Sequence, residues 1–212
     1  MRAGLVLAFF FLICEPGIAD PAEHYRCQLV PGPHARVRVY AVHGSMQNRI
    51  GPQFSYPRRA RMASAADIDA DGHIELLVLV YKSTRYDRKP AWRPFVYSLT
   101  DGIWAAKWLG SRVGRPLLEA VFVSTPKGYR LLTLERSGPG RTVLTLYHWT
   151  GFGFWGEWTG EPTPSASRLR VEAGSRDGAD RVSVSVGGRR RFYGFRDGGY
   201  VPVATIHRGK RK

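Results

Sequence analysis

Residues 67–80 read Asp-Ile-Asp-Ala-Asp-Gly-His-Ile-Glu-Leu-Leu-Val-Leu-Val, an acidic turn that leads directly into an apolar segment. The apolar segment is short, rich in leucine and valine, and preceded by a turn that contains glycine, which is typical of a buried β-strand. The turn and its edge carry four carboxylates, in a chain whose formal net charge at pH 7 is +15. The stretch therefore predicts a strand, and it raises the question of what neutralises the acidic side chains.

Outward from this stretch, apolar and polar residues alternate along most of the chain, and no segment sustains a helical period. The alternating segments are short and are separated by Gly, Pro, Asp and Ser, which favours turns between strands. Strands are expected at residues 36–43, 62–68, 75–81, 94–99, 104–109, 117–124, 129–135, 142–149, 154–158, 168–173, 181–186, 190–195 and 200–206. The sequence therefore predicts an all-β protein.

An internal repeat organises these segments. Residues 97–108 match residues 147–158, each beginning with tyrosine and ending with tryptophan, and residues 75–81 match residues 130–136 upstream. A weaker third copy covers residues 181–200, and a fourth is expected around residues 36–43. Each copy has the content of a four-stranded propeller blade or of a repeated β-meander. The predicted fold is a set of repeated four-stranded antiparallel units, forming a small or partial β-propeller.

The repeats are rich in aromatic residues, namely Trp104, Trp108, Trp149, Phe152, Phe154, Trp155 and Trp158. Such rings stack on sugars in some proteins and pack one sheet against the next in others. Their recurrence at equivalent positions favours packing. Trp155 breaks the alternation beside Phe154, so it is the best candidate for an exposed aromatic side chain.

The acidic turn has the spacing of a calcium-binding loop. Asp67, Asp69 and Asp71 take positions 1, 3 and 5, and Gly72 at position 6 permits a sharp turn. An EF-hand is excluded, because its position 12 requires a glutamate and this chain has Val78. The alternative is an Asp-rich turn that caps the strand without an ion. Calcium is favoured, since no Lys or Arg occurs between Arg61 and Lys82 to neutralise the carboxylates.

Residues 65–79 resemble the FG-GAP/VCBS family of extracellular β-propeller repeats, whose loop reads Asp-x-Asp-x-Asp-Gly-x-x-(Asp/Glu). The resemblance implies a structural calcium site with side-chain ligands from Asp67, Asp69, Asp71 and Glu75 and a backbone ligand from His73. The matching positions of the second repeat are Phe122, Ser124, Pro126 and Arg130, so a single site is expected.

Residues 1–19 predict a signal peptide, with Arg2 before an apolar run and small residues ending at Ala19. The run is shorter than the about 20 residues that span a bilayer. Cys14 takes the place of a lipoprotein cysteine, but Ile13 precedes it where a small residue is expected. Export to the periplasm or the medium is therefore ranked ahead of lipidation.

The mature chain keeps Cys27 as its single cysteine, which excludes an internal disulfide. The predicted layout continues with an N-terminal segment at 20–34, a β domain at 35–206 and a basic tail at 207–212.

The basic excess favours binding to polyanions. Its local clusters are the weak candidates for such a site, namely Arg58, Arg59, Arg61, Arg189, Arg190 and Arg191. Export makes nucleic acid a less accessible partner and favours a protein or an anionic glycan at the cell envelope. An Arg-rich composition without a specific partner is the competing interpretation, and self-assembly is left open.

Hydrolase and nucleotide-binding motifs, such as G-x-S-x-G, H-E-x-x-H and the Walker loop, are absent from the sequence. Cys27 with His24 or His34 is a weak nucleophile–base pair, because neighbours near a chain end rarely have supported geometry. The sequence therefore predicts a non-enzymatic binding or scaffold module. Two alternatives are a nucleic-acid or other polyanion-binding protein and a hydrolase on a propeller-like fold.

Overall fold

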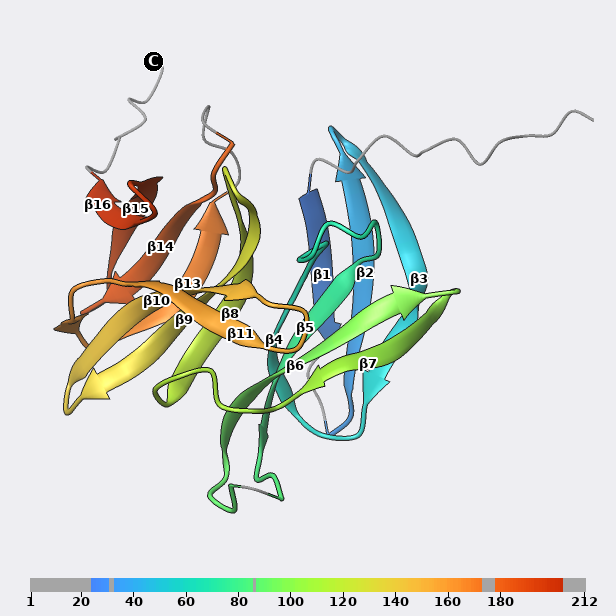
Figure 1. Cartoon of the computed structure of the whole chain (residues 1–212), viewed down its shortest axis with the longest axis horizontal. Coiled ribbons are helices and arrows are strands. Elements are labelled where there is room, and N and C mark those ends of the chain that lie inside the picture. Colours follow the sequence, from blue (N-terminus) through green and yellow to red (C-terminus); the bar gives the residue numbers. More distant parts are fainter. Residues whose placement is uncertain (1–23, 31–32, 86, 173–177, 204–212) are drawn as a thin grey trace, which may run out of the picture.

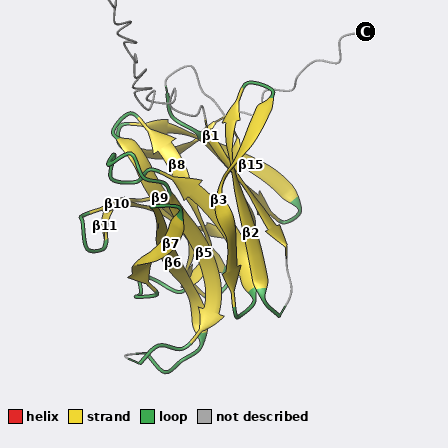
Figure 2. Cartoon of the chain, turned by 90° about the vertical axis from the view of Figure 1, so that its right-hand side faces the viewer, coloured by secondary structure: helices red, strands yellow, loops and turns green. Residues whose placement is uncertain are grey.

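The computed structural model describes residues 24–30, 33–85, 87–172 and 178–203. These residues form strands and loops only, and no helix among them is long and apolar enough to cross a membrane. The strands form four small antiparallel sheets arranged as a four-bladed β-propeller (Figures 1 and 2). The predicted all-β class and the repeated antiparallel units are confirmed. The expected signal peptide and basic tail lie outside the described residues.

Each sheet is a meander of consecutive strands. Sheet 1 contains β1 (His24–Val30), β2 (Ala35–His43) and β3 (Met46–Tyr56). Sheet 2 contains β4 (Ala60–Ala66), β5 (Glu75–Lys82), β6 (Ala91–Thr100) and β7 (Ile103–Leu109). Sheet 3 contains β8 (Leu117–Thr125), β9 (Gly128–Gly138), β10 (Arg141–Trp149) and β11 (Phe154–Thr159), and the short β12 (Thr163–Pro164) also pairs with β10. Sheet 4 contains β13 (Ala166–Glu172), β14 (Arg181–Val186), β15 (Arg189–Arg196) and β16 (Gly199–Val203).

The predicted repeat corresponds to the β6–β7 and β10–β11 hairpins, which share an irregularity. The register shifts between Val96 and Tyr97 in one hairpin and between Leu146 and Tyr147 in the other. In both hairpins the residue before the shift pairs with the repeated tryptophan, so that Trp108 and Trp158 take equivalent positions. Sheets 2 and 3 therefore share the same hairpin, including the position of its register shift.

Two long strands were not expected from the sequence. β1 lies in the segment 20–34 that was expected to precede the β domain, so sheet 1 begins at His24. β3 contains Gly51 and Pro52, two residue types that favour turns, yet the strand continues through them as an irregularity opposite Val37 and Val39. Gly51 has a φ of +62°, and a Cβ there would lie 2.9 Å from the Leu99 side chain. The glycine thus permits the irregularity and its close approach to sheet 2.

The first strands of the four sheets, β1, β4, β8 and β13, line the axis of the propeller. A pocket of ≈360 Å³ lies where they meet, and its walls include Arg26, Ala65, Val121 and Val171 from these four strands. In sheets 1 and 4 the later strands lie farther out, and Figure 1 shows β3 and β16 toward opposite sides of the molecule.

The central strand β5 is apolar from Leu76 to Val80, and both faces of this run are covered. Leu76, Val78 and Val80 pack with sheet 1, whereas Leu77 and Leu79 pack with sheet 3. Strands buried on both faces have continuous apolar sequences instead of alternating ones. The apolar run after the acidic turn thus marks the second strand of an internal blade.

Apolar cores fill three of the four junctions between sheets. One core lies between sheets 1 and 2, a second between sheets 2 and 3, and a third between sheets 3 and 4. Among the described residues, no such core joins sheet 4 to sheet 1. The faces that border this last junction are polar, and their residues are central to the candidate site.

Candidate functional site

The acidic loop between β4 and β5 is a compact turn held by its own carboxylates. Asp67 accepts hydrogen bonds from the N–H groups of Asp71, at 3.2 Å, and Gly72, at 3.0 Å. Asp71 accepts one from the N–H of His73 at 2.8 Å. One carboxylate oxygen from each of Asp67, Asp69 and Asp71 lies within 4.8 Å of the other two. Three of the predicted ligands are therefore gathered in one cluster.

The positive charge that the loop lacks in sequence comes from Lys107 on β7, at the outer edge of the same sheet. The Lys107 Nζ lies 2.7 Å from Asp69 Oδ2, 2.8 Å from Glu75 Oε1 and 3.8 Å from Asp71 Oδ2. Its side chain is 17% exposed, and it also lies 6.0 Å from the ring centre of Trp149 in sheet 3. Lys107 thus neutralises part of the acidic cluster from a distant strand.

Glu75 is the buried member of this network. Its side chain is fully buried, and its second oxygen accepts a hydrogen bond from the Ile68 N–H at 3.0 Å. Burial raises the pKa of the Glu75 carboxyl, while the hydrogen bonds from Lys107 and Ile68 act in the opposite direction. Burial would lower the pKa of Lys107, but its contacts with Asp69 and Glu75 outweigh this effect and raise it. The two groups therefore stabilise each other's charged form.

The donor set fits calcium in part. Three aspartate carboxylates on a tight loop are hard oxygen ligands of the kind that calcium prefers. Glu75 is not among the carboxylates of this cluster, and its two oxygens contact Lys107 and the Ile68 N–H. A cation at the three aspartates would also share Asp69 with the Lys107 ammonium, or displace it. The site thus offers fewer ligands than the sequence predicts, and it has an internal competitor.

The predicted basic clusters are separated in the structure. Arg58 and Arg59 are exposed before β4, whereas Arg189, Arg190 and Arg191 begin β15 in sheet 4. Arg190 pairs with Glu172 and bonds to Ser183, and it lies over the Phe192 ring at 5.0 Å. The two clusters do not form one patch with the aromatic residues of sheet 3.

Arg61 is held by contacts within the protein. Its guanidinium lies 3.1 Å from Glu119 Oε1 on β8 and 5.7 Å from the Trp92 ring centre. Glu119 is buried and also accepts hydrogen bonds from the backbone N–H groups of Arg168, at 3.2 Å, and Leu169. The Glu119 carboxylate therefore joins β4, β8 and β13 near the axis, and Arg61 is its counter-ion.

A more coherent basic surface lies on sheet 1, and sequence reasoning missed it. Arg36 and Arg38 alternate with the buried Val37 and Val39 on β2, and Arg26 and Arg49 flank the same face through their pairing with Tyr40. We call Arg26, Arg36, Arg38 and Arg49 the arginine face. All four side chains are exposed, and none makes an ion pair with a described residue.

The sequence does indicate the arginine face, because the segment that contains its four arginines has no acidic residues. No aspartate or glutamate occurs between Glu23 and Asp67, although seven arginines do. The opposite face of sheet 1 packs on sheet 2, so the arginine face is turned toward the junction with sheet 4. Sheet 4 borders that junction with Arg170, Arg181 and Arg190, and Glu172 is the acidic residue among them.

Most of the repeated aromatic residues pack between sheets. The Phe154 ring lies 5.2 Å from both Trp108 and Trp149, joining sheets 2 and 3. The Nε1 of Trp104 donates to the Pro52 carbonyl at 2.9 Å and thereby joins sheet 2 to sheet 1. Trp155 is 69% exposed and Phe152 is 85% exposed, both beside the β10–β11 turn. These two exposed rings lie on a different sheet from the arginine face.

Comparison with known proteins gives little beyond this geometry. No family model matches the chain, and no curated protein matches it. A solved structure described as a Xanthomonas Type IV Secretion System related protein is 12% identical, with a TM-score of 0.28, over 84% of this chain and 85% of that chain. The four-bladed arrangement is therefore argued from the sheets of this protein alone.

Proposed function

We propose that this protein is an exported, non-enzymatic binding module whose arginine face contacts an anionic glycan at the cell envelope. The observation that carries the proposal is the arginine face itself. Four arginines share one side of a sheet that contains no carboxylate, so their charges have no internal partners. An unpaired cationic surface attracts polyanions and increases their association rate.

The spacing of the arginine face suits a linear polyanion. Neighbouring strands lie about 4.8 Å apart, and alternate residues on one strand lie about 6.6 Å apart. A sheet therefore presents its arginines as a regular array, and each guanidinium forms bidentate hydrogen bonds with carboxylate, sulfate or phosphate groups. Gln28 and Gln53 lie beside Arg38 and add neutral hydrogen-bonding groups suited to sugar hydroxyls.

An anionic glycan fits this surface better than nucleic acid does. Single-stranded nucleic acids are held by aromatic side chains that stack with bases beside the basic residues. Beside the arginine face, the described part of sheet 1 places one aromatic residue, Tyr40, between Arg26 and Arg49, and its hydroxyl is 3.4 Å from Gln28. The exposed ring of Trp155 belongs to β11 of sheet 3, and that of Phe152 to the turn before this strand. The expected signal peptide also favours a partner outside the cytoplasm.

We also propose that a calcium ion binds the Asp67, Asp69 and Asp71 carboxylates in a structural role. The support is the closeness of the three carboxylates and the resemblance of the loop to FG-GAP/VCBS repeats. Bound calcium would neutralise the loop and stabilise the β4–β5 turn. Glu75 would stay with Lys107, because its carboxylate is fully buried and already accepts hydrogen bonds from Lys107 and the Ile68 N–H.

The glycan proposal is tested with a heparin-derived sulfated oligosaccharide and two variants of equal charge. Arg36→Gln with Arg38→Gln removes two charges from the arginine face. Arg136→Gln with Arg196→Gln removes two charges from exposed positions on sheets 3 and 4. At about 0.5–1 kcal/mol per contact, the first pair lowers affinity by about 5–30-fold. The second pair leaves affinity nearly unchanged.

Equal loss in both double variants would show that only the net charge matters, and it would contradict a specific face. A single-stranded DNA oligonucleotide of the same charge is the comparison ligand. Tighter binding of the DNA, lost selectively in the Arg36 and Arg38 double variant, would replace the glycan with nucleic acid as the partner.

A further inference from the structure

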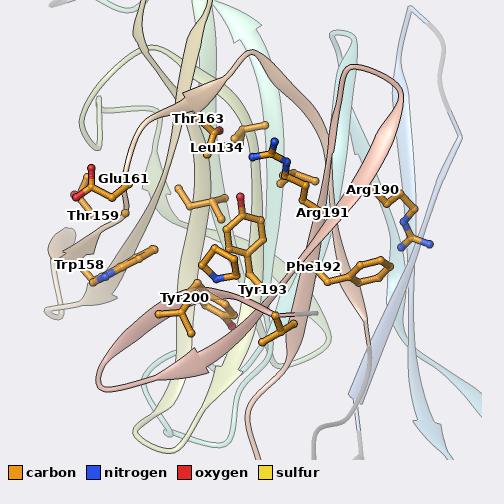
Figure 3. A pocket seen from close by; sticks show the side chains of 16 residues that line it. Leu134, Trp158, Thr159, Glu161, Thr163, Arg190, Arg191, Phe192, Tyr193 and Tyr200 are labelled. Atoms are coloured by element: carbon orange, nitrogen blue, oxygen red, sulfur yellow. The ribbon is translucent and has the colours of Figure 1, made fainter. Parts of the chain in front are cut away.

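A second candidate site lies on the other side of sheet 4, between its outer strands and those of sheet 3. A pocket of ≈630 Å³ opens there between β10–β12 and β14–β16, and Figure 3 shows the side chains that line it. This volume is within the range of about 300–1,000 Å³ that is common for small-molecule sites. The arginine face does not contribute to it.

The wall of the pocket is mainly apolar. It includes Leu134, Leu144, Trp158, Val184, Tyr193 and Pro202. Trp158 and Tyr200, one from each sheet, lie with their ring centres 6.4 Å apart and pack across the junction. Transfer of a hydrocarbon group from water to such a surface is favourable by about 25 cal/mol per Å².

Tyr200 adds an unused polar group. Its side chain is 2% exposed, and its hydroxyl has no hydrogen-bond partner among the described residues. A buried polar atom without a partner is uncommon in native proteins and calls for an explanation. The hydroxyl is closed off from solvent, so a ligand or an ordered water from the neighbouring pocket would reach it only after a local movement of the side chains.

The charges at the rim are divided between its two sides. Arg191 lies on the face of β15 that bears Tyr193, and it makes no ion pair with a described residue. Arg190 and Phe192 point to the other side of β15, as Figure 3 shows. Glu161 stands at the opposite rim. The Arg191 end of the pocket thus attracts an anionic group. The Glu161 end repels such a group, so a ligand with one anionic group fits better than a ligand with two.

We propose that this pocket binds an amphipathic anion, a ligand with a hydrocarbon body and a single carboxylate or phosphate head. The hydrocarbon body packs against Trp158 and Tyr193, and the head lies beside Arg191. The head group belongs either to a free molecule or to a lipid in a membrane, since both have the same chemistry.

The test is calorimetric titration of the mature protein with decanoate and with decyltrimethylammonium, which have chains of equal length and heads of opposite charge. Decanoate binds more tightly to the parent protein. Arg191→Gln reduces decanoate affinity by about tenfold, Arg191→Lys retains most of it, and Arg196→Gln leaves it unchanged. Thermal unfolding of each variant establishes that it is folded.

Vesicles that contain an anionic phospholipid distinguish the two sources of the head group. Vesicle binding that is lost in Arg191→Gln assigns a membrane lipid, and decanoate binding without vesicle binding assigns a free ligand. Equal affinity for decanoate and decyltrimethylammonium, the absence of binding to both, or an Arg191→Gln protein that binds decanoate like the parent would overturn the proposal.

Discussion

The ammonium group of Lys107 lies 2.7 Å from a carboxylate oxygen of Asp69, although 38 positions separate the two residues in sequence. The contact joins the outermost strand of sheet 2 to the loop between its first two strands. It supplies from a distance the positive charge that residues 62–81 lack. Lys107 is thus both a tie within the sheet and a competitor of any cation at the acidic loop.

Replacement of Lys107 by methionine is expected to destabilise the protein by about 1–3 kcal/mol. Breaking a fully buried ion pair costs about 3–5 kcal/mol, and the loss here is smaller because Asp69 is partly exposed. The cause is the Glu75 carboxylate, which stays buried without its cation. The thermal midpoint in excess chelator measures this loss. An uncharged methionine side chain cannot compete for Asp69, so calcium should stabilise the Lys107→Met variant more than the parent.

The size of the calcium effect in the parent follows from mass action. A dissociation constant of about 10⁻⁴ M and 1 mM calcium give about 1.4 kcal/mol, or about 3–6 °C in thermal midpoint. Asp69→Ala is the control and should lose the shift. A shift in the Lys107→Met protein alone would make Lys107 the resident cation of the loop. No shift in any of these proteins would leave the loop as a turn without an ion.

Glu119→Gln is expected to destabilise the protein by about 1.5–3 kcal/mol, because the Glu119 carboxylate is buried and accepts charged and backbone hydrogen bonds from two other sheets. Thermal unfolding should show a midpoint lower by roughly 3–12 °C. Glu157→Gln is the matched control, because Glu157 pairs with Arg130 at a more exposed site. Equal effects of the two substitutions would refute the special role of Glu119 at the axis.

The ion pairs of Asp87 should make the protein less stable in strong acid. Its hydrogen bonds from Arg93 and Arg112 lower the pKa of the Asp87 carboxyl to about 2, and Arg93 is almost fully buried. A lowered folded-state pKa gives stability that is present above the unfolded pKa of about 3.9 and is lost as the pH falls toward 2. Asp87→Asn should therefore be less stable than the parent at pH 7.

The measurement for Asp87 is the thermal midpoint of parent and variant between pH 2 and pH 7. The difference between the two proteins should shrink below about pH 4 and be mostly lost at pH 2. Asp101→Asn, at an exposed turn position, should show no such trend. A difference that stays constant across this range would exclude the ion pair as its source.

Cys27 should react slowly with alkylating reagents in the folded protein. Burial raises the pKa of the Cys27 thiol to about 12, so at pH 8 about 10⁻⁴ of it is thiolate, the reactive form. Alkylation by iodoacetamide, followed by mass spectrometry of the protein, should be fast only in denaturant. Rapid modification of the native protein, or a disulfide-linked dimer under mild oxidation, would contradict this environment.

The fold was more accessible from the sequence than the site was. Apolar runs, turn residues and the repeated tyrosine–tryptophan hairpin depend on local pattern, so they predicted the strands of sheets 2 to 4. β3 was missed because Gly51 and Pro52 favour a turn by local preference, whereas in the structure the strand continues through them close to Leu99 of sheet 2. β1 was missed because its segment was assigned to an N-terminal extension.

The site depends on contacts between distant residues. The acidic loop is one continuous segment, so its spacing was readable, whereas the Lys107 contact requires knowledge of how β7 folds over it. The arginine face is assembled from three strands, and only strand register reveals that Arg26 and Arg49 flank Arg38. In the sequence, the arginine face is indicated only by the lack of aspartate and glutamate at residues 24–66. A search for runs of adjacent arginines does not detect this.

The most direct test of the arginine face is the salt dependence of binding to the sulfated oligosaccharide. Each neutralised anionic group contributes about −0.7 to −0.9 to the slope of log K against log salt concentration, so four arginines predict a slope of about −3. The Arg36 and Arg38 double variant should reduce the slope by about 1.5, and the Arg136 and Arg196 double variant should leave it unchanged. Parallel lines for all three proteins would contradict the account, because the arginine face would then make no contact with the ligand.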